Sequence, residues 1–352
     1  MYEIISDFQT LLVSYQKARL CKRFNDTILR FGFFLEGNLL RLQRELKSGE
    51  YAPSSYVCFT ILDPKVRRVA APAFRDRVVQ HALVSQIEPL FEKRFIYDSY
   101  ACRKGKGTHF GMQRVKKFLA GVRSFFGGKK EIYCLRMDIE KFFASVSWDI
   151  LLTLIFQQVT CPKTRELIRK IMTQHRCFDT HNRPIAPPAD IVCPKERRGL
   201  PIGNLTSQLF ANIYLNELDH FAKETLRIRW YARYMDDFLI IHQDKKYLHK
   251  TKHDIEAFLK QTLKLRLKKE KVVVSNVSSG VPFVGYRIFY DHVLIRGSTL
   301  LRMQRKLRKR RKDRKNGYIS RRVFKTGLAS IDGHLRYADS FNLSQKLLHR
   351  KR

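Results

Sequence analysis

The spacing of hydrophobic residues predicts that the first part of the chain is helical. Four leucines between positions 35 and 46 recur at steps of four, three and four residues, which puts them on one face of a helix. Gly49 and Pro53 end this pattern. We therefore expect residues 1–45 to form an N-terminal helical extension.

Hydrophobic runs further along predict both strands and helices. Residues 56–62 are rich in aromatic and β-branched side chains, and residues 66–71 return after a turn as the second strand of a hairpin. Apolar runs at 132–138 and 227–242 predict buried strands, and the second run is interrupted at Met235-Asp236-Asp237. More strand is expected over 272–290. Helical spacing is found at these segments: 75–92, about 108–122, 148–174, 204–223, 246–267 and 302–315.

The order of these elements favours one fold class. Helices and strands alternate irregularly, so we expect an α+β fold instead of a doubly wound parallel sheet. The 352 residues are enough for two or three subdomains around a shared cleft.

The net charge of the chain indicates what kind of partner it binds. The chain has 69 Lys and Arg against 32 Asp and Glu, a formal net charge of +37. Such an excess predicts a polyanionic partner, and nucleic acid is the usual one, although ribosomal and membrane-surface proteins are also basic. The seven cysteines are an odd number without a CxxC pair, which is typical of reduced thiols in a cytoplasmic protein. No apolar run approaches the ~18 residues that a membrane span requires, so no membrane partner is expected.

Two neighbouring carboxylates carry the candidate chemistry. Asp236 and Asp237 repel each other unless a cation lies nearby, and their apolar flanks argue against the alternative of a solvated turn. Asp138 ends another apolar strand, with a helix N-cap as the alternative interpretation. Mg²⁺ prefers carboxylate oxygens, and phosphodiester synthesis uses two divalent ions. The sequence thus predicts a two-metal site.

Longer motifs connect these acids to a family. The YMDD sequence at 234–237 resembles the YxDD hairpin of reverse transcriptases. Most of that family has Gln-Gly-x-x-x-Ser-Pro in motif B, whereas this chain has Ile-Gly-x-x-x-Ser-Gln at 202–208. That form is the sharpest resemblance to the reverse transcriptases of diversity-generating retroelements. The supporting segments are SYACRKGKGTH (99–109), RGLPIGNLTSQLFANIYLNELD (198–219), RYMDDF (233–238), FVGYR (283–287) and SIDGHLRYADSFN (330–342).

The resemblance implies a right-hand polymerase with fingers, palm and thumb, in which an antiparallel palm sheet carries the catalytic aspartates. The fingers would span 46–131. The palm would span 132–150 and 199–290, with an insertion at 151–198. Residues 291–352 would form a basic helical thumb.

The resemblance also implies roles at the reaction centre. Asp138, Asp236 and Asp237 would be catalytic and, with the backbone carbonyl of Ile139, would hold two Mg²⁺ ions, with Mn²⁺ able to substitute. Phe143 would lie under the incoming sugar and exclude a 2′-hydroxyl, unless it is simply a core aromatic. The full set of residues expected to bind the dNTP is Lys65, Arg67, Phe143, Ile202, Gly203, Gln208 and Lys271. Lys268 and Lys269 compete with Lys271 for the role of the lysine that protonates pyrophosphate.

Further residues would hold nucleic acid. Phe283, Gly285 and Tyr286 resemble the primer grip. Ten of the fourteen residues at 302–315 are Lys or Arg. A thumb helix that contacts phosphates is the preferred interpretation of this run, with a nuclear-localisation signal or disorder as alternatives. The residues expected to bind the backbone are Arg305, Lys306, Lys309 and Arg310.

The resemblance implies a function in a bacterial or phage-infected bacterial cytoplasm. The enzyme would copy a template-repeat RNA into cDNA with frequent errors opposite adenine. Its partners would be template RNA, primer or cDNA, dNTPs and a small basic accessory protein that forms a pentameric ring. Two alternatives remain: a reverse transcriptase of a phage-defence or retron system, and a catalytically idle RNA-binding scaffold. As a hypothesis for the low fidelity, Ile202 cannot make the hydrogen bond that a Gln would make near the nascent pair.

Overall fold

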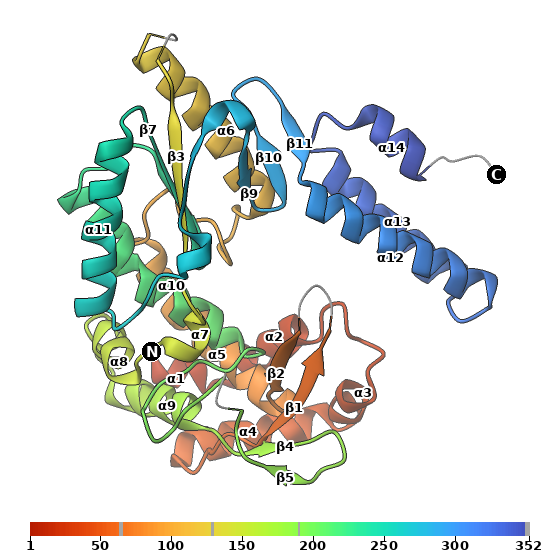
Figure 1. The fold of residues 1–352 in the computed structure, drawn as a ribbon. Helices are drawn as coiled ribbons and strands as arrows, with labels where there is room; N and C mark the ends of the chain where they lie inside the picture. Colours follow the sequence, from red (N-terminus) through yellow and green to blue (C-terminus); the bar gives the residue numbers. More distant parts are fainter. Residues whose placement is uncertain (63–65, 128–129, 189–190, 349–352) are drawn as a thin grey trace. The chain divides into compact units, whose positions relative to one another are not determined.

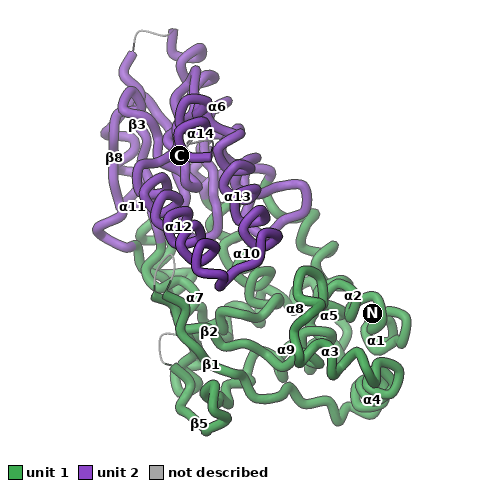
Figure 2. Tube along the Cα trace, turned by 90° about the vertical axis from the view of Figure 1, so that its right-hand side faces the viewer, with its two compact units in different colours: residues 1–96, 139–221, 255–267 green, residues 97–138, 222–254, 268–352 purple. Residues whose placement is uncertain are grey.

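A computed structural model describes residues 1–62, 66–127, 130–188 and 191–348 (Figure 1). The chain forms two compact units (Figure 2). Unit 1 contains residues 1–96, 139–221 and 255–267, and unit 2 contains residues 97–138, 222–254 and 268–352. Among the described residues, no helix has the length and apolar character needed to cross a bilayer.

Unit 1 begins with the predicted helices. They are α1 (Tyr2–Ile5), α2 (Phe8–Ala18), α3 (Asp26–Phe33) and α4 (Leu35–Ser48). Leu39, Leu42 and Leu46 are buried on one face of α4, as their spacing predicts. The helix ends at Gly49, which has the left-handed φ of 79° that glycine adopts without strain.

The other helices of unit 1 form its core. They are α5 (Phe74–Glu92), α7 (Phe142–Ser145), α8 (Trp148–Phe156), α9 (Pro162–Thr173) and α10 (Leu205–His220). Helix α5 packs against α2 and α10, and α10 also packs against α8. The segment predicted to be helical over 148–174 contains two helices, α8 and α9. Proline is disfavoured inside a helix but favoured at its first position, so Pro162 starts a new helix.

A small mixed sheet completes unit 1, in the order β2-β1-β4-β5. The predicted hairpin is confirmed, since β1 (Tyr56–Ile61) pairs antiparallel with β2 (Arg67–Ala71). Strand β4 (Cys177–Phe178) runs parallel to β1 and antiparallel to β5 (Pro184–Ile185). Both short strands lie within the segment expected to be an insertion at 151–198.

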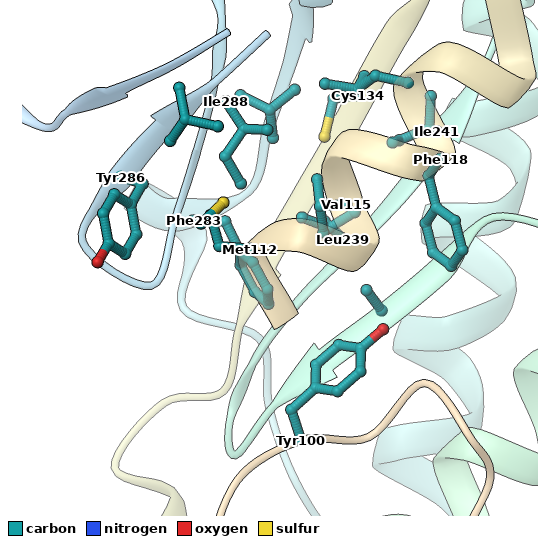
Figure 3. Close-up of a cluster of buried hydrophobic side chains, with 14 of the residues drawn as sticks. Tyr100, Met112, Val115, Phe118, Cys134, Leu239, Ile241, Phe283, Tyr286 and Ile288 are labelled. Atoms are coloured by element: carbon teal, nitrogen blue, oxygen red, sulfur yellow. The ribbon is translucent and has the colours of Figure 1, made fainter. Parts of the chain in front are cut away.

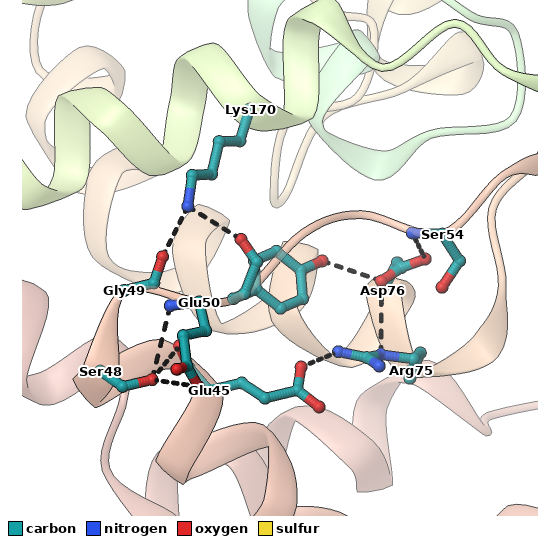
Figure 4. A network of polar contacts seen from close by, with 9 residues as sticks. Glu45, Ser48, Gly49, Glu50, Ser54, Arg75, Asp76 and Lys170 are labelled. Atoms are coloured by element: carbon teal, nitrogen blue, oxygen red, sulfur yellow. Dashed lines mark hydrogen bonds and ion pairs between the residues drawn. The ribbon is translucent and has the colours of Figure 1, made fainter.

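Polar contacts tie α4, α5 and α9 together (Figure 4). The carboxylate of Asp76 accepts hydrogen bonds from Tyr51 Oη and Ser54 N, both at 2.9 Å. Lys170 Nζ donates to the carbonyls of Gly49 and Tyr51 at 2.7 and 3.0 Å. Burial raises the pKa of Asp76, and these donors oppose that shift. The network satisfies polar groups that would otherwise be costly to bury.

Unit 2 is built on an antiparallel sheet in the order β6-β7-β3-β8. The strands are β3 (Tyr133–Asp138), β6 (Tyr231–Tyr234), β7 (Asp237–His242) and β8 (Val273–Asn276). A second antiparallel sheet, β11-β10-β9, consists of β9 (Val281–Phe283), β10 (Tyr286–Ile288) and β11 (Val293–Ile295). Strands were predicted in all these segments except β11.

Helices cover these sheets. Helix α6 (Thr108–Phe125) packs against β6, β7 and β10. Its apolar face supplies Met112, Val115 and Phe118 to a core shared with Cys134, Leu239 and Phe283 (Figure 3). Three helices follow at the C-terminal end, with α13 between the other two: α12 (Gly297–Lys315), α13 (Arg321–Leu335) and α14 (Phe341–Leu348).

Helix α11 (Lys245–Gln261) passes from unit 2 to unit 1 along the chain. It ends earlier than the predicted residue 267, because Lys264 adopts a left-handed φ of 53° and Leu265 N caps the carbonyl of Leu259. The α+β fold class is confirmed by the two antiparallel sheets with separate helices. The boundaries given for fingers, palm and thumb stay a prediction.

Candidate active site

A tight turn between two strands of unit 2 presents Asp236. Strands β6 and β7 pair antiparallel with Tyr234 opposite Asp237, so Met235 and Asp236 form a two-residue hairpin loop. Met235 has a positive φ of 56°. A non-glycine residue pays a conformational penalty there, and such strain is often found at functional sites.

The neighbouring strand brings Asp138 to the same end of the sheet. Strand β3 lies beside β7 (Figure 1). In their antiparallel register, Asp138 is directly opposite Asp237. Helix α7 has Lys141 at its N-cap, so the alternative interpretation of Asp138 as a helix cap is wrong. Carboxylates from sequence positions about a hundred residues apart are thus neighbours across one strand pair.

The environment of Asp237 disfavours its charged form. The pKa of this carboxyl is raised to about 7: burial is the largest cause, the charges of Asp138 and Asp236 also raise it, and Arg136 and Lys271 oppose the shift. The mutual repulsion shows that the three acids act on each other electrostatically. A cation bound among them would relieve this repulsion and lower the pKa.

Lys271 supplies positive charge at this end of the sheet. Its Nζ donates to Oδ2 of Asp138, whose side chain is 13% exposed. Lys268 N donates to the carbonyl of Asp138 at 2.8 Å, so the backbone also links this segment to β3. Of the three candidate lysines, Lys271 is the one whose ammonium contacts an aspartate in the described contacts.

The acids fit a divalent cation in donor type and charge. Hard carboxylate oxygens suit Mg²⁺ and Mn²⁺. However, in the part of the chain that the structure describes, no three acidic, imidazole or thiol side chains converge closely enough to hold one metal ion. The predicted ligands are therefore neighbours, but in the described residues their side chains do not form a complete metal-coordination site. Lys271 is hydrogen-bonded to one of them, Asp138.

Several residues predicted to bind the nucleotide meet within unit 1. Ala70 N, in β2, donates to the carbonyl of Ile202 at 2.9 Å. A side chain on Gly203 would put its Cβ 2.6 Å from the carbonyl oxygen of Ala70, and the φ at Gly203 is 133°. Only glycine fits this close approach. Leu200 N donates to the carbonyl of Phe143 at 2.7 Å. This bond connects Phe143, which follows Asp138 by five residues, to the segment that leads into motif B.

The side chains of this group differ in exposure. Phe143 is half-buried and packs edge-on against Phe142, and its contact with the incoming sugar stays a prediction. Arg67, at the start of β2, and Gln208, in the first turn of α10, are exposed. Ile139 is buried in unit 1. Lys65 lies outside the described residues.

The predicted primer grip is a hairpin of unit 2. Phe283 and Tyr286 pair across the β9–β10 turn, in which Gly285 has a φ of 93°. Tyr286 Oη donates to the carbonyl of His334 in α13 at 3.0 Å, and the two rings stack. Burial lowers the pKa of His334 to about 4, which favours a neutral imidazole here.

The basic run at 302–315 is helical, because it lies within α12, which rules out the alternative of disorder. Arg305, Lys306 and Lys309 are exposed, while Leu307 is buried against the rest of unit 2. Arg310 is less available, since its Nη1 donates to the carbonyl of Val323 in α13 at 3.2 Å. The exposed cations form a surface suited to phosphates.

Sequence reasoning missed two arginines near the acids. Arg136 lies two residues before Asp138, so the period of a strand predicts that both side chains share a face. That signal was available. Arg233 is 0% exposed and hydrogen-bonded to the loop of Met235 and Asp236, which we call the aspartate turn. One more arginine in so basic a chain gives no such signal.

Comparisons with known proteins agree with this geometry. The reverse transcriptase (RNA-dependent DNA polymerase) family profile matches residues 62–288. The chain is 26% identical over 299 residues to protein YkfC of Escherichia coli K12, which covers 75% of this chain and 74% of that protein. It is 22% identical over 342 residues to the group II intron-encoded protein LtrA of Lactococcus lactis subsp. cremoris, which covers 79% of this chain and 53% of that protein.

Solved structures of telomerase share the fold. Telomerase from Candida albicans, in complex with a TWJ fragment of telomeric RNA, aligns with a TM-score of 0.51 at 12% identity, covering 85% of this chain and 61% of that chain. Apo telomerase from Candida tropicalis, truncated from its C-terminal domain, also gives 0.51, at 15% identity, with 72% and 58% covered. The predicted right-hand polymerase fold is thereby confirmed.

The chain spans about half the length of LtrA and less than two thirds of either telomerase chain. The family profile covers well over half of this chain and includes every strand of the aspartate-bearing sheet. The chain therefore belongs to the reverse transcriptase family, and its enzyme class is RNA-directed DNA polymerase.

Proposed function

We propose that Asp138, Asp236 and Asp237 are the catalytic residues for copying RNA into DNA. The observation that carries the proposal is the register of β3 and β7, which pairs Asp138 with Asp237 beside the turn at Asp236. Two Mg²⁺ ions, or Mn²⁺ in their place, would be held by these carboxylates with the carbonyl of Ile139. When bound, such ions activate the primer 3′-hydroxyl and neutralise the leaving pyrophosphate.

Lys271 would act on the leaving group. Its ammonium already lies on Asp138, so it is within reach of groups that bind to that carboxylate. As an acid it would donate a proton to pyrophosphate, and as a cation it would offset developing charge. Lys268 and Lys269 are less suited, since the described contacts give neither a bond to a catalytic aspartate.

The dNTP would be selected by the residues of unit 1 that the sequence predicts to bind it. Lys65 and Arg67 would contact the triphosphate, Phe143 would exclude a 2′-hydroxyl, and Gly203 with Gln208 would line the base-pair side. Support comes from the hydrogen bonds that join Ala70 to Ile202 and Leu200 to Phe143. Replacing Phe143 with Ala should increase incorporation of ribonucleotides, and primer extension with each nucleotide type measures this.

Phe283, Gly285 and Tyr286 would hold the primer terminus, and Arg305, Lys306, Lys309 and Arg310 would bind the template–primer backbone. Phosphate contacts of this kind position nucleic acid without reading its sequence.

We further propose that the enzyme serves a diversity-generating retroelement. It would make error-prone cDNA from a template-repeat RNA in a bacterial or phage-infected cytoplasm, together with a small basic accessory protein assembled as a pentameric ring. The support is the Ile-Gly-x-x-x-Ser-Gln form of motif B at 202–208 and the segments at 99–109 and 330–342.

The cDNA error pattern tests this role. The purified chain would extend a DNA primer on an RNA template that contains all four bases, with Mg²⁺ and dNTPs, and the cDNA would be sequenced. Errors should concentrate opposite template adenine. Equal error rates opposite the four bases would reject the diversity-generating role while leaving the polymerase intact.

Ile202 provides a sharper version of the same test. If the missing hydrogen bond lowers fidelity, Ile202→Gln should reduce errors opposite adenine about two- to tenfold, the effect of roughly 0.5–1.5 kcal/mol. Ile202→Leu keeps the volume without adding a hydrogen-bonding group and should leave the error rate unchanged. An unchanged rate in Ile202→Gln would remove this residue from the explanation.

The similarity to the group II intron-encoded protein LtrA favours a second candidate, a reverse transcriptase associated with an intron. The retron and phage-defence alternatives stay predictions. Such an enzyme would share the polymerase chemistry. It would show no excess of errors opposite adenine, so the same sequencing experiment separates the two candidates.

A further inference from the structure

Arg233 is a fully buried cation beside the aspartate turn. It lies in β6, three residues before Asp236, and its side chain is 0% exposed. Removing a guanidinium from water costs several kcal/mol unless its N–H groups find acceptors in good geometry. A buried arginine at this position therefore calls for a structural or functional reason.

Its hydrogen bonds reach the turn directly. Nη1 donates to the carbonyl of Met235 at 3.1 Å, and Nη2 donates to Oγ of Ser99 at 3.0 Å. The Met235 carbonyl belongs to the peptide that joins Met235 to Asp236. The guanidinium thus fixes the orientation of this peptide, in which Met235 has its strained φ of 56°.

The segment around Ser99 anchors the arginine in turn. Arg233 N donates to the carbonyl of Asp98 at 3.0 Å, and Tyr100 N donates to the carbonyl of Arg233 at 3.1 Å, so the segment pairs with β6 as a short parallel bridge. Arg103 Nη1 donates to the carbonyl of Ser99 at 2.8 Å. The backbone of the Ser99 segment is therefore held on both sides.

Helix α6 holds the far end of this network. Asp98 is 5% exposed and accepts from Arg114 Nε of α6 at 2.8 Å and from Tyr100 Oη at 3.0 Å. Arg114 connects the network to the helix that packs on β6 and β7. All these residues belong to unit 2.

We infer that Arg233, braced by Ser99, is a positioning residue that sets the conformation of the Met235–Asp236 peptide and thereby the direction of the Asp236 carboxylate. The inference rests on the proposed catalytic role of Asp236. A misplaced carboxylate should bind a divalent ion less well and should slow the chemical step, while nucleotide affinity changes little.

Conservative substitutions test this role. Arg233→Lys keeps the charge but cannot span both acceptors, because a lysine ends in one ammonium. Ser99→Ala removes the second acceptor, and Ser99→Thr retains a hydroxyl. Leu119→Ala, at a buried core residue of α6 that has no hydrogen-bonding side chain, provides a control for general loss of stability in unit 2.

Two readouts separate positioning from folding. Mn²⁺ binding to the nucleotide-free protein is measured by electron paramagnetic resonance, and kcat and dNTP KM are measured on a primed RNA template. Arg233→Lys should weaken Mn²⁺ binding and lower kcat by about tenfold each, with KM changed less than about twofold. Ser99→Ala should show a smaller loss of the same kind, and Ser99→Thr should restore it.

The controls decide what a failure means. If Leu119→Ala lowers thermal stability as much as Arg233→Lys and also loses Mn²⁺ binding and kcat, the positioning role is overturned. Wild-type Mn²⁺ binding and kcat in Arg233→Lys would overturn it too. If Asp236→Ala itself retains full activity, the proposed catalytic site fails instead, whatever Arg233 does.

Discussion

The aspartate turn and helix α12 are both charged regions of unit 2, but their structures differ. The turn has few ionisable groups, partly buried and held by strand register and by Arg233. Helix α12 carries many exposed cations, and its buried residues are Thr299 and Leu307. Chemistry at the turn depends on the placement of single atoms, whereas binding along the helix depends on summed charge. Single substitutions should therefore be severe in the first region and mild in the second.

The largest effect should follow the loss of one carboxylate. Asp138→Asn keeps the size of the side chain but removes its charge, so kcat for primer extension should fall by at least about 10²–10³-fold. Asp149→Asn, at an exposed acid of α8, is the matched control and should retain activity. Similar activity in both variants would contradict the expected difference between a catalytic carboxylate and an exposed surface carboxylate.

A combined change in α12 should have the next largest effect. Replacing Arg305, Lys306, Lys309 and Arg310 with Ala should weaken binding of an RNA–DNA primer-template at least about tenfold near physiological salt, because each lost phosphate contact lowers the salt slope by roughly 0.7–0.9. The affinity measured as a function of salt concentration checks this. A fall in kcat at saturating primer-template, with an unchanged salt slope, would contradict the assignment.

Stability should distinguish the two regions as well. The carboxyl of Asp237 has a pKa of about 7 against an ordinary 3.8, so the folded state keeps a proton that the unfolded chain loses between these values. Stability without divalent ions therefore falls as the pH rises through that window. Asp237→Asn should stabilise the protein at pH 8 by on the order of 1–3 kcal/mol and add little below pH 4.

Urea unfolding at the two pH values measures this effect. Lys309→Ala on exposed α12 serves as the comparison and should show no such dependence. A destabilised Asp237→Asn protein at pH 8 would mean that Asp237 is charged and favourably paired in the folded state.

The smallest effect should come from a single cation of α12. Lys309→Ala should weaken primer-template binding by less than about threefold and lower the salt slope by at most about one. A loss as large as that of the variant with four substitutions would mean that Lys309 makes one dominant contact. That result would contradict the difference expected between the aspartate turn and α12.

The sequence was informative where local pattern and chemistry coincide. The β6–β7 hairpin was predicted because two apolar runs flank the paired acids, and the β1–β2 hairpin because a turn motif separates two segments rich in β-branched residues. The helical spacing over 148–174 did not give the boundary between α8 and α9, because the apolar spacing continues on both sides of Pro162. Local periodicity does not show where one helix ends and the next begins.

Contacts between distant segments could not be predicted in the same way. The register that pairs Asp138 with Asp237, and the choice of Lys271 over its neighbours, depend on which strands pair in three dimensions. Arg233 is the clearest case, since a buried arginine and an exposed one look alike in a sequence with 69 basic residues. Burial is a property of the folded chain.

The most direct measurement of the central claim is dNTP-dependent extension of a DNA primer on an RNA template in Mg²⁺, with wild-type protein and Asp236→Ala compared at equal folded concentration. We expect template-complementary DNA from the wild type and at least about a 10²-fold loss in the variant. Undiminished synthesis by Asp236→Ala would contradict the account.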